Sequence, residues 1–396
     1  MRLLVVATVL NLVAATMAVH AQTPSGNTSP QEPKPPETAK PTETVKPWWE
    51  RLTFYGDLRA RYEGFFQDEL ETRQRERFRF RLGVRTPIAE GLDFNLRLAS
   101  GDAADVTSTN QSLTDFLNRK PINLDQLSLA YTPSQAKALT LGVGKYAFPL
   151  TRTQMVWDDD VNWEGTYEQV GWRWEPMTFR VVGVQSPINE VGGGEDAFMF
   201  GEYAQVGFGV GGHAVQLSIA DYAFRNADQI AVALAERTVI RTPSTNALRR
   251  NRAGQVIGYQ SGFNLVDVIG QVTVNTGRTH YPFTALADFV LNTEAANDDD
   301  SGVWVVGSYG RAAAAKTFAA TYTFARVERD AVVSAYNFSD MGPPTNVVMN
   351  MATFSYMPRS RVNLDFIAIL TRLIDPPAGD PNALLKRIQI DARVSF

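Results

Sequence analysis

Apolar and polar side chains alternate with a period of two along most of this chain. The clearest case is residues 75–85, where Phe78, Phe80, Leu82 and Val84 alternate with five arginines. Successive side chains of a β-strand point to opposite faces, so this pattern predicts a strand with one apolar and one strongly basic face. A soluble sheet would also alternate, and the order of the connections has to separate the two cases.

Sixteen segments carry this alternation. They lie near residues 52–62, 75–85, 92–98, 123–133, 138–146, 164–175, 178–185, 196–209, 212–222, 260–274, 281–292, 302–310, 317–328, 346–357, 361–372 and 384–396. The connections between them are alternately short and long, as in up-and-down membrane barrels and unlike Greek-key sandwiches. We therefore predict an all-β fold, a transmembrane up-and-down antiparallel β-barrel of about sixteen strands. Fourteen or eighteen strands stay open, because the segments at 178–185 and 302–310 are weak.

The N-terminus predicts an exported protein. Arg2 precedes an apolar run to about Ala18, and Val19-His20-Ala21 fits a cleavage site, so residues 1–21 are expected to be a signal peptide. An anchoring helix is the alternative, but it needs about 20 apolar residues. Residues 22–47 contain seven prolines and no aromatic residue, which predicts a disordered periplasmic linker. Residues 48–396 are then the barrel domain.

Composition narrows the chemistry further. The chain has no cysteine, which excludes disulfides, zinc–thiolate sites and thiol catalysis. The formal charge is -4, and loss of Arg2 with the signal makes it -5, so bulk charge gives no reason to expect nucleic-acid binding. After signal removal only His213 and His280 remain, and neither stands in a recognisable nucleophile context. We expect no enzyme activity, no cofactor and no metal.

The basic strand faces suggest a charged interior. An arginine on the lipid side near the membrane midplane costs about 2–4 kcal/mol, so these side chains should point inward. The side chains predicted to line the pore are Asp57, Arg59, Arg61, Arg75, Arg77, Arg79, Arg81 and Arg97. A row of guanidinium groups attracts anions and can orient carboxylates or phosphates. The alternative is a charged wall balanced by acids, with no specific ligand. The seven tryptophans fall mostly near strand ends, which predicts interfacial girdles.

Several stretches resemble the putative porin family of Gram-negative outer membranes. They are Gly56–Glu63, Arg73–Arg79, Leu96–Asp102, Ser108–Gln111, Leu141–Lys145, Trp157–Asp160 and Asp330–Asn337. The resemblance covers the chain from about Trp48, and the alternating last strand ends at Phe396 in the manner of a barrel-assembly signal. It implies the cell outer membrane, a periplasmic N-terminal tail, and contact with lipid, lipopolysaccharide and the barrel-assembly machinery. A homotrimer stays open.

The resemblance also directs attention to the third long connection, residues 146–163. In general diffusion porins the corresponding loop folds inward and sets acidic groups against a basic wall. By similarity, Arg152, Asp158, Asp159 and Asp160 are expected at a constriction, although a solvated acidic loop is the alternative. The expected function is passive diffusion of small hydrophilic solutes or ions. The alternatives are an anion- or phosphate-selective porin, a polysaccharide-export barrel and, last, a barrel enzyme.

Overall fold

The computed structural model describes residues 47–396, except residues 69, 114–115 and 237–243. The expected signal peptide, and all but the last residue of the expected linker, lie outside the described residues. Trp48–Phe396 forms one compact unit that holds every element below. Among the described residues, no helix is both long and apolar enough to span a membrane.

Strands dominate the described chain. In order, the elements are η1 (Trp48–Arg51), β1 (Thr53–Phe66), β2 (Arg73–Ala89), β3 (Leu92–Ser100), β4 (Gln111–Ser112), β5 (Ile122–Tyr131), β6 (Leu139–Tyr146), β7 (Trp163–Trp174), β8 (Met177–Asn189), β9 (Ala197–Val210), β10 (His213–Arg225), α2 (Asp228–Glu236), β11 (Leu248–Arg250), β12 (Val256–Tyr259), β13 (Asn264–Val274), β14 (Phe283–Asn292), β15 (Ser301–Gly310), β16 (Thr317–Val327), η2 (Ser339–Met341), β17 (Val347–Arg359), β18 (Val362–Leu373) and β19 (Leu385–Ser395).

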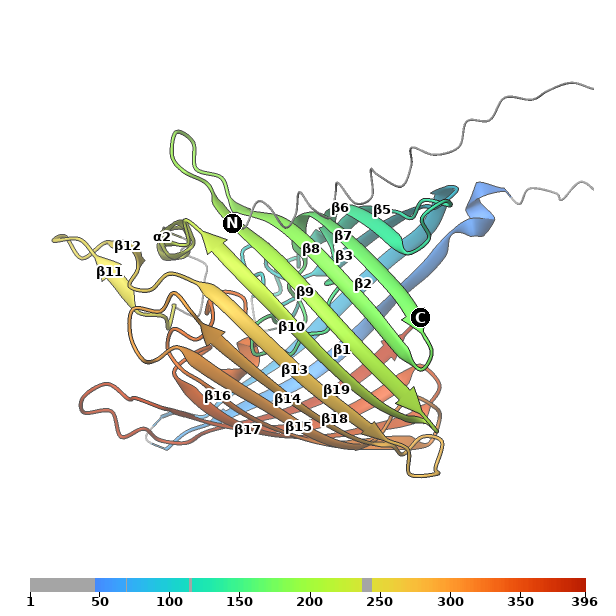
Figure 1. Ribbon diagram of the computed structural model, residues 1–396. Coiled ribbons are helices and arrows are strands. Elements are labelled where there is room, and N and C mark those ends of the chain that lie inside the picture. The colour runs from blue at the N-terminus through green and yellow to red at the C-terminus, as the bar shows by residue number, and fades with distance from the viewer. Residues whose placement is uncertain (1–46, 69, 114–115, 237–243) are drawn as a thin grey trace, which may run out of the picture. The chain divides into compact units, whose positions relative to one another are not determined.

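Sixteen of these strands form one closed antiparallel sheet (Figure 1). Each pairs with the next long strand along the chain, and β1 pairs with β19, so no edge is left open. The two-residue strand β4 adds to β2 beyond the end of β3, and β11 and β12 form a separate hairpin. The predicted all-β barrel of about sixteen strands is therefore confirmed, and neither fourteen nor eighteen describes the sheet.

The strand alternation separates two faces of the barrel wall. In β1, Leu58 is 50% exposed on the outer face, whereas its neighbour Asp57 is 5% exposed on the inner face. The same contrast appears in β19, where Val394 lies outside and Asp391 inside. The barrel wall thus has an apolar outer face and a charged inner face, the arrangement that a membrane barrel needs because charges on the lipid side are costly.

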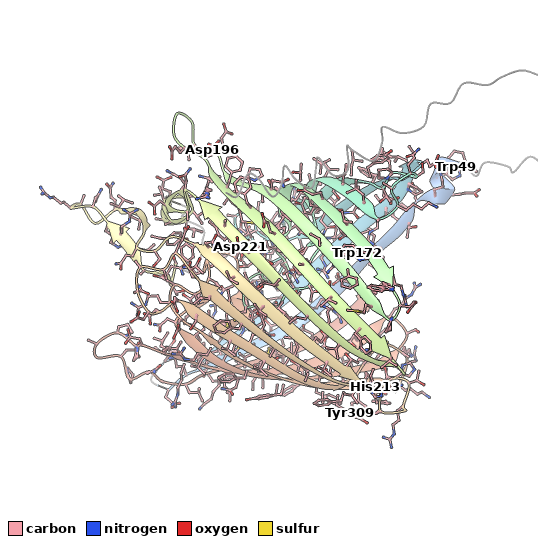
Figure 2. All side chains as sticks on the ribbon, in the orientation of Figure 1. Trp49, Trp172, Asp196, His213, Asp221 and Tyr309 are labelled. Atoms are coloured by element: carbon pink, nitrogen blue, oxygen red, sulfur yellow. The ribbon has the colours of Figure 1, made fainter. Side chains whose placement is uncertain are left out.

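The connections sort to the two ends of the barrel. Figure 2 shows His213 and Tyr309, beside the β9–β10 and β15–β16 connections, at one end and Asp196, in the β8–β9 connection, at the other. The longest connection runs from β10 to β13 and contains helix α2 and the β11–β12 hairpin. The sequence pattern indicated only a polar loop there, because these elements are too short to show a period.

An aromatic core lies inside the barrel where the third long loop packs against the wall. Trp157 of that loop contacts Trp163 and Tyr222, with ring centroids 5.1 and 5.5 Å apart. Trp157, Trp163 and Trp304 are each at most 3% exposed, so the girdle interpretation is wrong for these three. Trp172 lies on the outer face, where Figure 2 labels it, as a girdle residue would.

Candidate functional site

Three adjacent strands, β19, β1 and β2, present a charged surface to the barrel interior. We call the arginines of this surface that form ion pairs with carboxylates the arginine wall: Arg59, Arg61, Arg75, Arg77, Arg79, Arg81 and Arg387. The antiparallel register places Arg59 opposite Arg79, and Arg61 opposite Arg77. Because residues directly opposite share a face, the period-two pattern of each strand builds a continuous two-dimensional patch.

Asp57 neutralises the part of the wall that is nearer the short turns. Its Oδ2 accepts a hydrogen bond from Arg79 at 2.6 Å, and its Oδ1 accepts one from Arg81 at 2.6 Å. The carboxylate comes from β1 itself, two residues before Arg59. Charge-assisted bonds of this kind hold both guanidinium groups in fixed positions.

Glu63 and Asp391 neutralise the rest. Glu63 is fully buried and binds Arg75, Arg387 and Gln389. Asp391 of β19 accepts two hydrogen bonds from Arg61, each 2.7 Å long. Glu63, Asp391 and Arg387 were not among the residues predicted to line the pore. Their polar strand faces were readable, but their roles depend on the closing register between β1 and β19.

Arg97 lies on the neighbouring strand β3 and belongs to a separate small network. It donates to Asp125 of β5 at 2.5 Å and to Asn162 at 3.4 Å. Asn162 also donates to Asp125, at 2.8 Å. The arginine is therefore paired locally and does not contact the acids that bind the arginine wall.

The β6–β7 loop, residues 147–162, folds into the barrel and separates its three aspartates. Asp160 lies 3.7 Å from Arg81 and 4.0 Å from Arg79. Asp159 is exposed and pairs with Arg152, at 3.0 Å. This differs from the expectation that all three aspartates oppose the arginines, because Asp160 alone reaches the wall.

Asp158 has a structural position. It is 4% exposed, and its two carboxylate oxygens accept hydrogen bonds from the backbone amides of Asp160 and Ser339. Burial raises the pKa of Asp158 well above its usual range, and the nearby charge of Asp160 raises this pKa further. Asp158 therefore links two loops instead of contributing charge to an open surface.

A second loop, the β16–β17 loop of residues 328–346, also enters the barrel. Its Asp340 binds Arg61 at 3.0 Å, Arg387 at 2.5 Å and Gln389 at 3.0 Å. No periodic pattern marks this residue, so its place in the site was not predicted. The wall thus meets two carboxylates from loops, Asp160 and Asp340, in addition to its own three.

The two inward loops are bonded to each other through their backbones. The amide of Asp158 donates to the carbonyl of Tyr336 at 2.7 Å, and the amide of Phe338 donates to the carbonyl of Gln154 at 2.9 Å. Thr153 additionally donates to Asp288 of β14. The β6–β7 loop is therefore fixed both to the β16–β17 loop and to the barrel wall.

Asp340 should remain ionised far into the acid range. Burial alone would raise its pKa, but Arg387 and Arg61 outweigh burial and hold it far below the usual value. A lowered pKa means that the ionised pair contributes its full stability above the ordinary pKa of about 3.9. That contribution is lost only as the pH falls further, towards the lowered pKa.

We expect the Asp340→Asn substitution to lower the free energy of unfolding by about 3–5 kcal/mol, because two buried guanidinium groups lose a charged partner. The thermal midpoint difference between variant and wild type should stay constant from pH 7 to about 4.5 and shrink below the ordinary carboxyl pKa. Asp159→Asn, at the exposed carboxylate, is the control and should show little difference. A thermal midpoint difference that grows on acidification would contradict a lowered pKa for Asp340.

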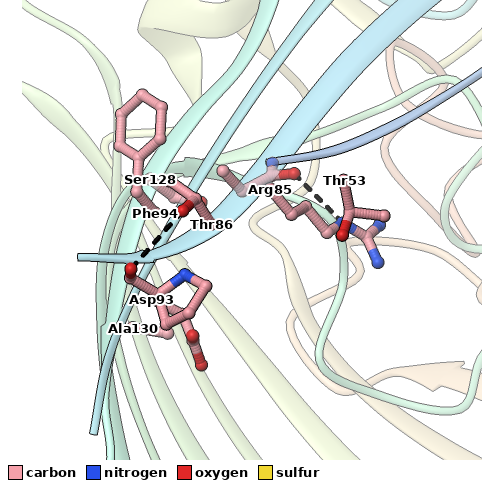
Figure 3. A pocket seen from close by; sticks show the side chains of 9 residues that line it. Thr53, Arg85, Thr86, Asp93, Phe94, Ser128 and Ala130 are labelled. Carbon is pink, nitrogen blue, oxygen red and sulfur yellow. Dashed lines mark hydrogen bonds between the residues drawn. The ribbon is translucent and has the colours of Figure 1, made fainter. Parts of the chain in front are cut away.

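Open space remains between the arginine wall and the short turns. A cavity of about 310 Å³ is lined by Thr53, Arg85, Asn95 and Ser128, among others (Figure 3). A second cavity, of about 490 Å³, is lined by residues that include Arg180 and Gln205. Polar side chains thus continue along the interior from the wall towards the short turns.

The histidines lie away from this site. His213 is exposed beside a short turn, and its Nδ1 accepts a hydrogen bond from the amide of Asn275. His280 lies in the short connection between β13 and β14. Among the described residues, no contact joins either histidine to a serine hydroxyl.

Comparison with known proteins agrees with the barrel. The model of a family described as "Putative porin" matches residues 66–268, just over half of the chain. No curated protein sequence matches the chain. The high-pH structure of Pseudomonas putida OprB has a TM-score of 0.59 at 13% identity, covering 88% of this chain and 95% of that chain. Its low-pH structure has a TM-score of 0.52 at 11% identity, covering 88% and 93%. At such identities the likeness shows the fold alone.

Proposed function

Because the chain belongs to the putative porin family, we propose that its barrel is a passive outer-membrane channel for small hydrophilic solutes or ions. The observation that carries this proposal is the arginine wall inside a closed barrel, faced by carboxylates from two inward loops. The fold supplies a route across the membrane, and the charged interior supplies a surface that water and polar solutes can wet. Catalysis forms no part of the proposal.

The charged groups would act together as a constriction. Seven guanidinium groups of the wall contact five carboxylates: Asp57, Glu63, Asp160, Asp340 and Asp391. The surplus is positive, so we expect a preference for anions over cations. The charges are held in place by the sheet and by two mutually bonded loops, so their field is steady and would orient dipolar solutes.

The proposal includes an orientation and surroundings. The even number of strands brings both ends of the barrel chain to the end with the short turns, which we place in the periplasm together with the N-terminal tail. The long connections then face the cell exterior and lipopolysaccharide. Delivery by the barrel-assembly machinery and assembly into a homotrimer belong to the same proposal.

A polysaccharide-export barrel fits the interior less well. Such a channel needs a wide lumen, but the β6–β7 and β16–β17 loops both enter the barrel and bond to each other. Anion selectivity, by contrast, follows from the positive surplus.

Planar-bilayer recording tests the proposal. The purified, heat-modifiable protein should insert in discrete conductance steps, and its reversal potential in a potassium chloride gradient should have the sign of anion preference. A heat-denatured sample of the same preparation is the control. Folded protein that repeatedly enters bilayers without conducting would contradict the channel function.

A further inference from the structure

The arginines of the wall are not equally well paired. Arg61 and Arg79 each contact a wall carboxylate at 2.7 Å or less. The nearest carboxylate oxygens to Arg59 and Arg77 lie at 3.6 and 3.7 Å, beyond hydrogen-bond distance. Two neighbouring guanidinium groups therefore have an ion-pair partner at longer range but no hydrogen bond to a carboxylate.

Arg77 is buried, and Arg59 is largely shielded from solvent. Arg77 is 9% exposed, and the Arg59 side chain is 12% exposed. Among the described residues, neither Nε atom has a hydrogen-bond partner. A guanidinium group carries five N–H donors, but within the part of the chain that the structure describes each of these two makes a single hydrogen bond, to a neutral oxygen. Buried donors that stay unpaired are costly, so this arrangement favours an additional acceptor.

A count of the charges agrees with this pairing. The wall has two more guanidinium groups than it has carboxylates in contact with it, and two of its arginines have no carboxylate oxygen within hydrogen-bond distance. The surplus is thus concentrated at Arg59 and Arg77 and not spread along the wall. Neutralising it takes one doubly charged or two singly charged anions.

The two groups converge on one short segment of the β3–β4 connection. Arg59 donates to Oδ1 of Asn110 at 2.6 Å, and Arg77 donates to Oγ of Ser108 at 3.2 Å. Nδ2 of Asn110 in turn donates to Oγ of Ser108, at 3.2 Å. Two arginines from adjacent strands are thereby held next to the same hydroxyl and amide groups, which are neutral hydrogen-bonding partners for a bound oxyanion.

We infer that Arg59 and Arg77, with Ser108 and Asn110, form a binding site for a small oxyanion, a carboxylate or a phosphate, on the channel wall. The forked donors of the two arginines match the oxygen geometry of both anions. The inference rests on the proposed channel function, since the anion reaches the site through the lumen. It adds that oxyanions bind there during passage, whereas chloride experiences only the general field.

The test is competition in single-channel recordings. Inorganic phosphate and, separately, acetate are added at increasing concentration to a channel carrying chloride current. In the wild type, at least one of them should reduce the chloride current in a saturable manner. Which of the two acts at the lower concentration assigns the site to a tetrahedral or a planar oxyanion.

Arg59→Gln and Arg77→Gln should each raise the half-blocking concentration by about tenfold or more, as expected when a charge-assisted hydrogen bond is lost. Arg180→Gln, which removes a lumen charge from β8 outside the wall, is the matched control and should leave the block unchanged. The oxyanion site would be overturned if Arg180→Gln weakened the block equally or if both wall variants kept the wild-type block. The two arginines would then contribute only to the general electrostatic field of the channel, with water on their free donors.

A measurement without conduction separates this inference from the channel proposal. Isothermal titration of the detergent-purified barrel with phosphate and acetate should give saturable binding that is lost in Arg59→Gln and Arg77→Gln but kept in Arg180→Gln. Binding without conductance would contradict the channel and retain the site. Conductance without saturable block or binding would support the channel and contradict the oxyanion site.

Discussion

Replacing Arg77, Arg79 and Arg81 together with glutamine should convert the channel from anion to cation preference. The wall has two more arginines than the carboxylates that contact it, and the triple variant leaves one carboxylate in excess. Asp57 would lose both of its partners and become a free negative charge in the interior. The reversal potential in a salt gradient should therefore change sign.

Two comparisons sharpen this result. Lysines at the same three positions keep the charge and should keep the anion preference, although the fork geometry is lost. Asp160→Asn should strengthen the anion preference, because it removes a carboxylate close to Arg81. Breaking buried pairs costs about 3–5 kcal/mol each, so heat-modifiable migration must first show that the barrels fold. An unchanged reversal potential in the folded triple variant would exclude the arginine wall from the selective region.

Deleting Phe396 should sharply reduce the amount of folded barrel in the outer membrane. The residue closes the seam, because its amide and carbonyl each form a 3.0 Å hydrogen bond with Gly56 of β1. Its ring lies over Gly56, so close that a Cβ atom there would be 2.8 Å from the ring. Deletion removes the backbone pair and the apolar contact together, at the point where the last strand meets the first.

Substitutions at Phe396 separate these contributions. Phe396→Ala keeps the backbone pair and should give an intermediate yield, whereas Phe396→Tyr keeps the aromatic ring and should resemble the wild type. The yield is read as the heat-modifiable fraction in outer membranes, with periplasmic degradation products as the counterpart. Wild-type yield after deletion would show that neither the ring nor the terminal pair assists assembly.

The fold was predictable because a two-residue period and an alternation of connection lengths are local properties of the chain. Most of the sixteen strands show their two faces within their own residues, and closure is what a membrane sheet needs to pair every edge. Helix α2, with nine residues, and strands β11 and β12, with three and four, were not predicted, since such short segments hold too few positions to show a period.

The site was only partly predictable for a related reason. The inward faces of β1 and β2 could be read from the sequence, and they supplied most of the arginine wall. The partner of each arginine depends on register and on where the loops go. Glu63 needed the β1–β19 register, and Asp340 needed the course of a loop that carries no repeating pattern. Trp157 was misread because an aromatic residue near a strand end fits a girdle and a buried loop anchor equally well.

The bonds between the two inward loops also set the order in which the interior can be completed. The β6–β7 loop is made early along the chain, but its backbone partner, the β16–β17 loop, follows ten strands later. Arg387 and Asp391 come later still, on the strand that closes the sheet. A barrel arrested before its last strands are inserted therefore has an edge open to lipid and an interior without its counter-charges. The sheet therefore closes and the charged interior is completed in the same step, when β19 pairs with β1.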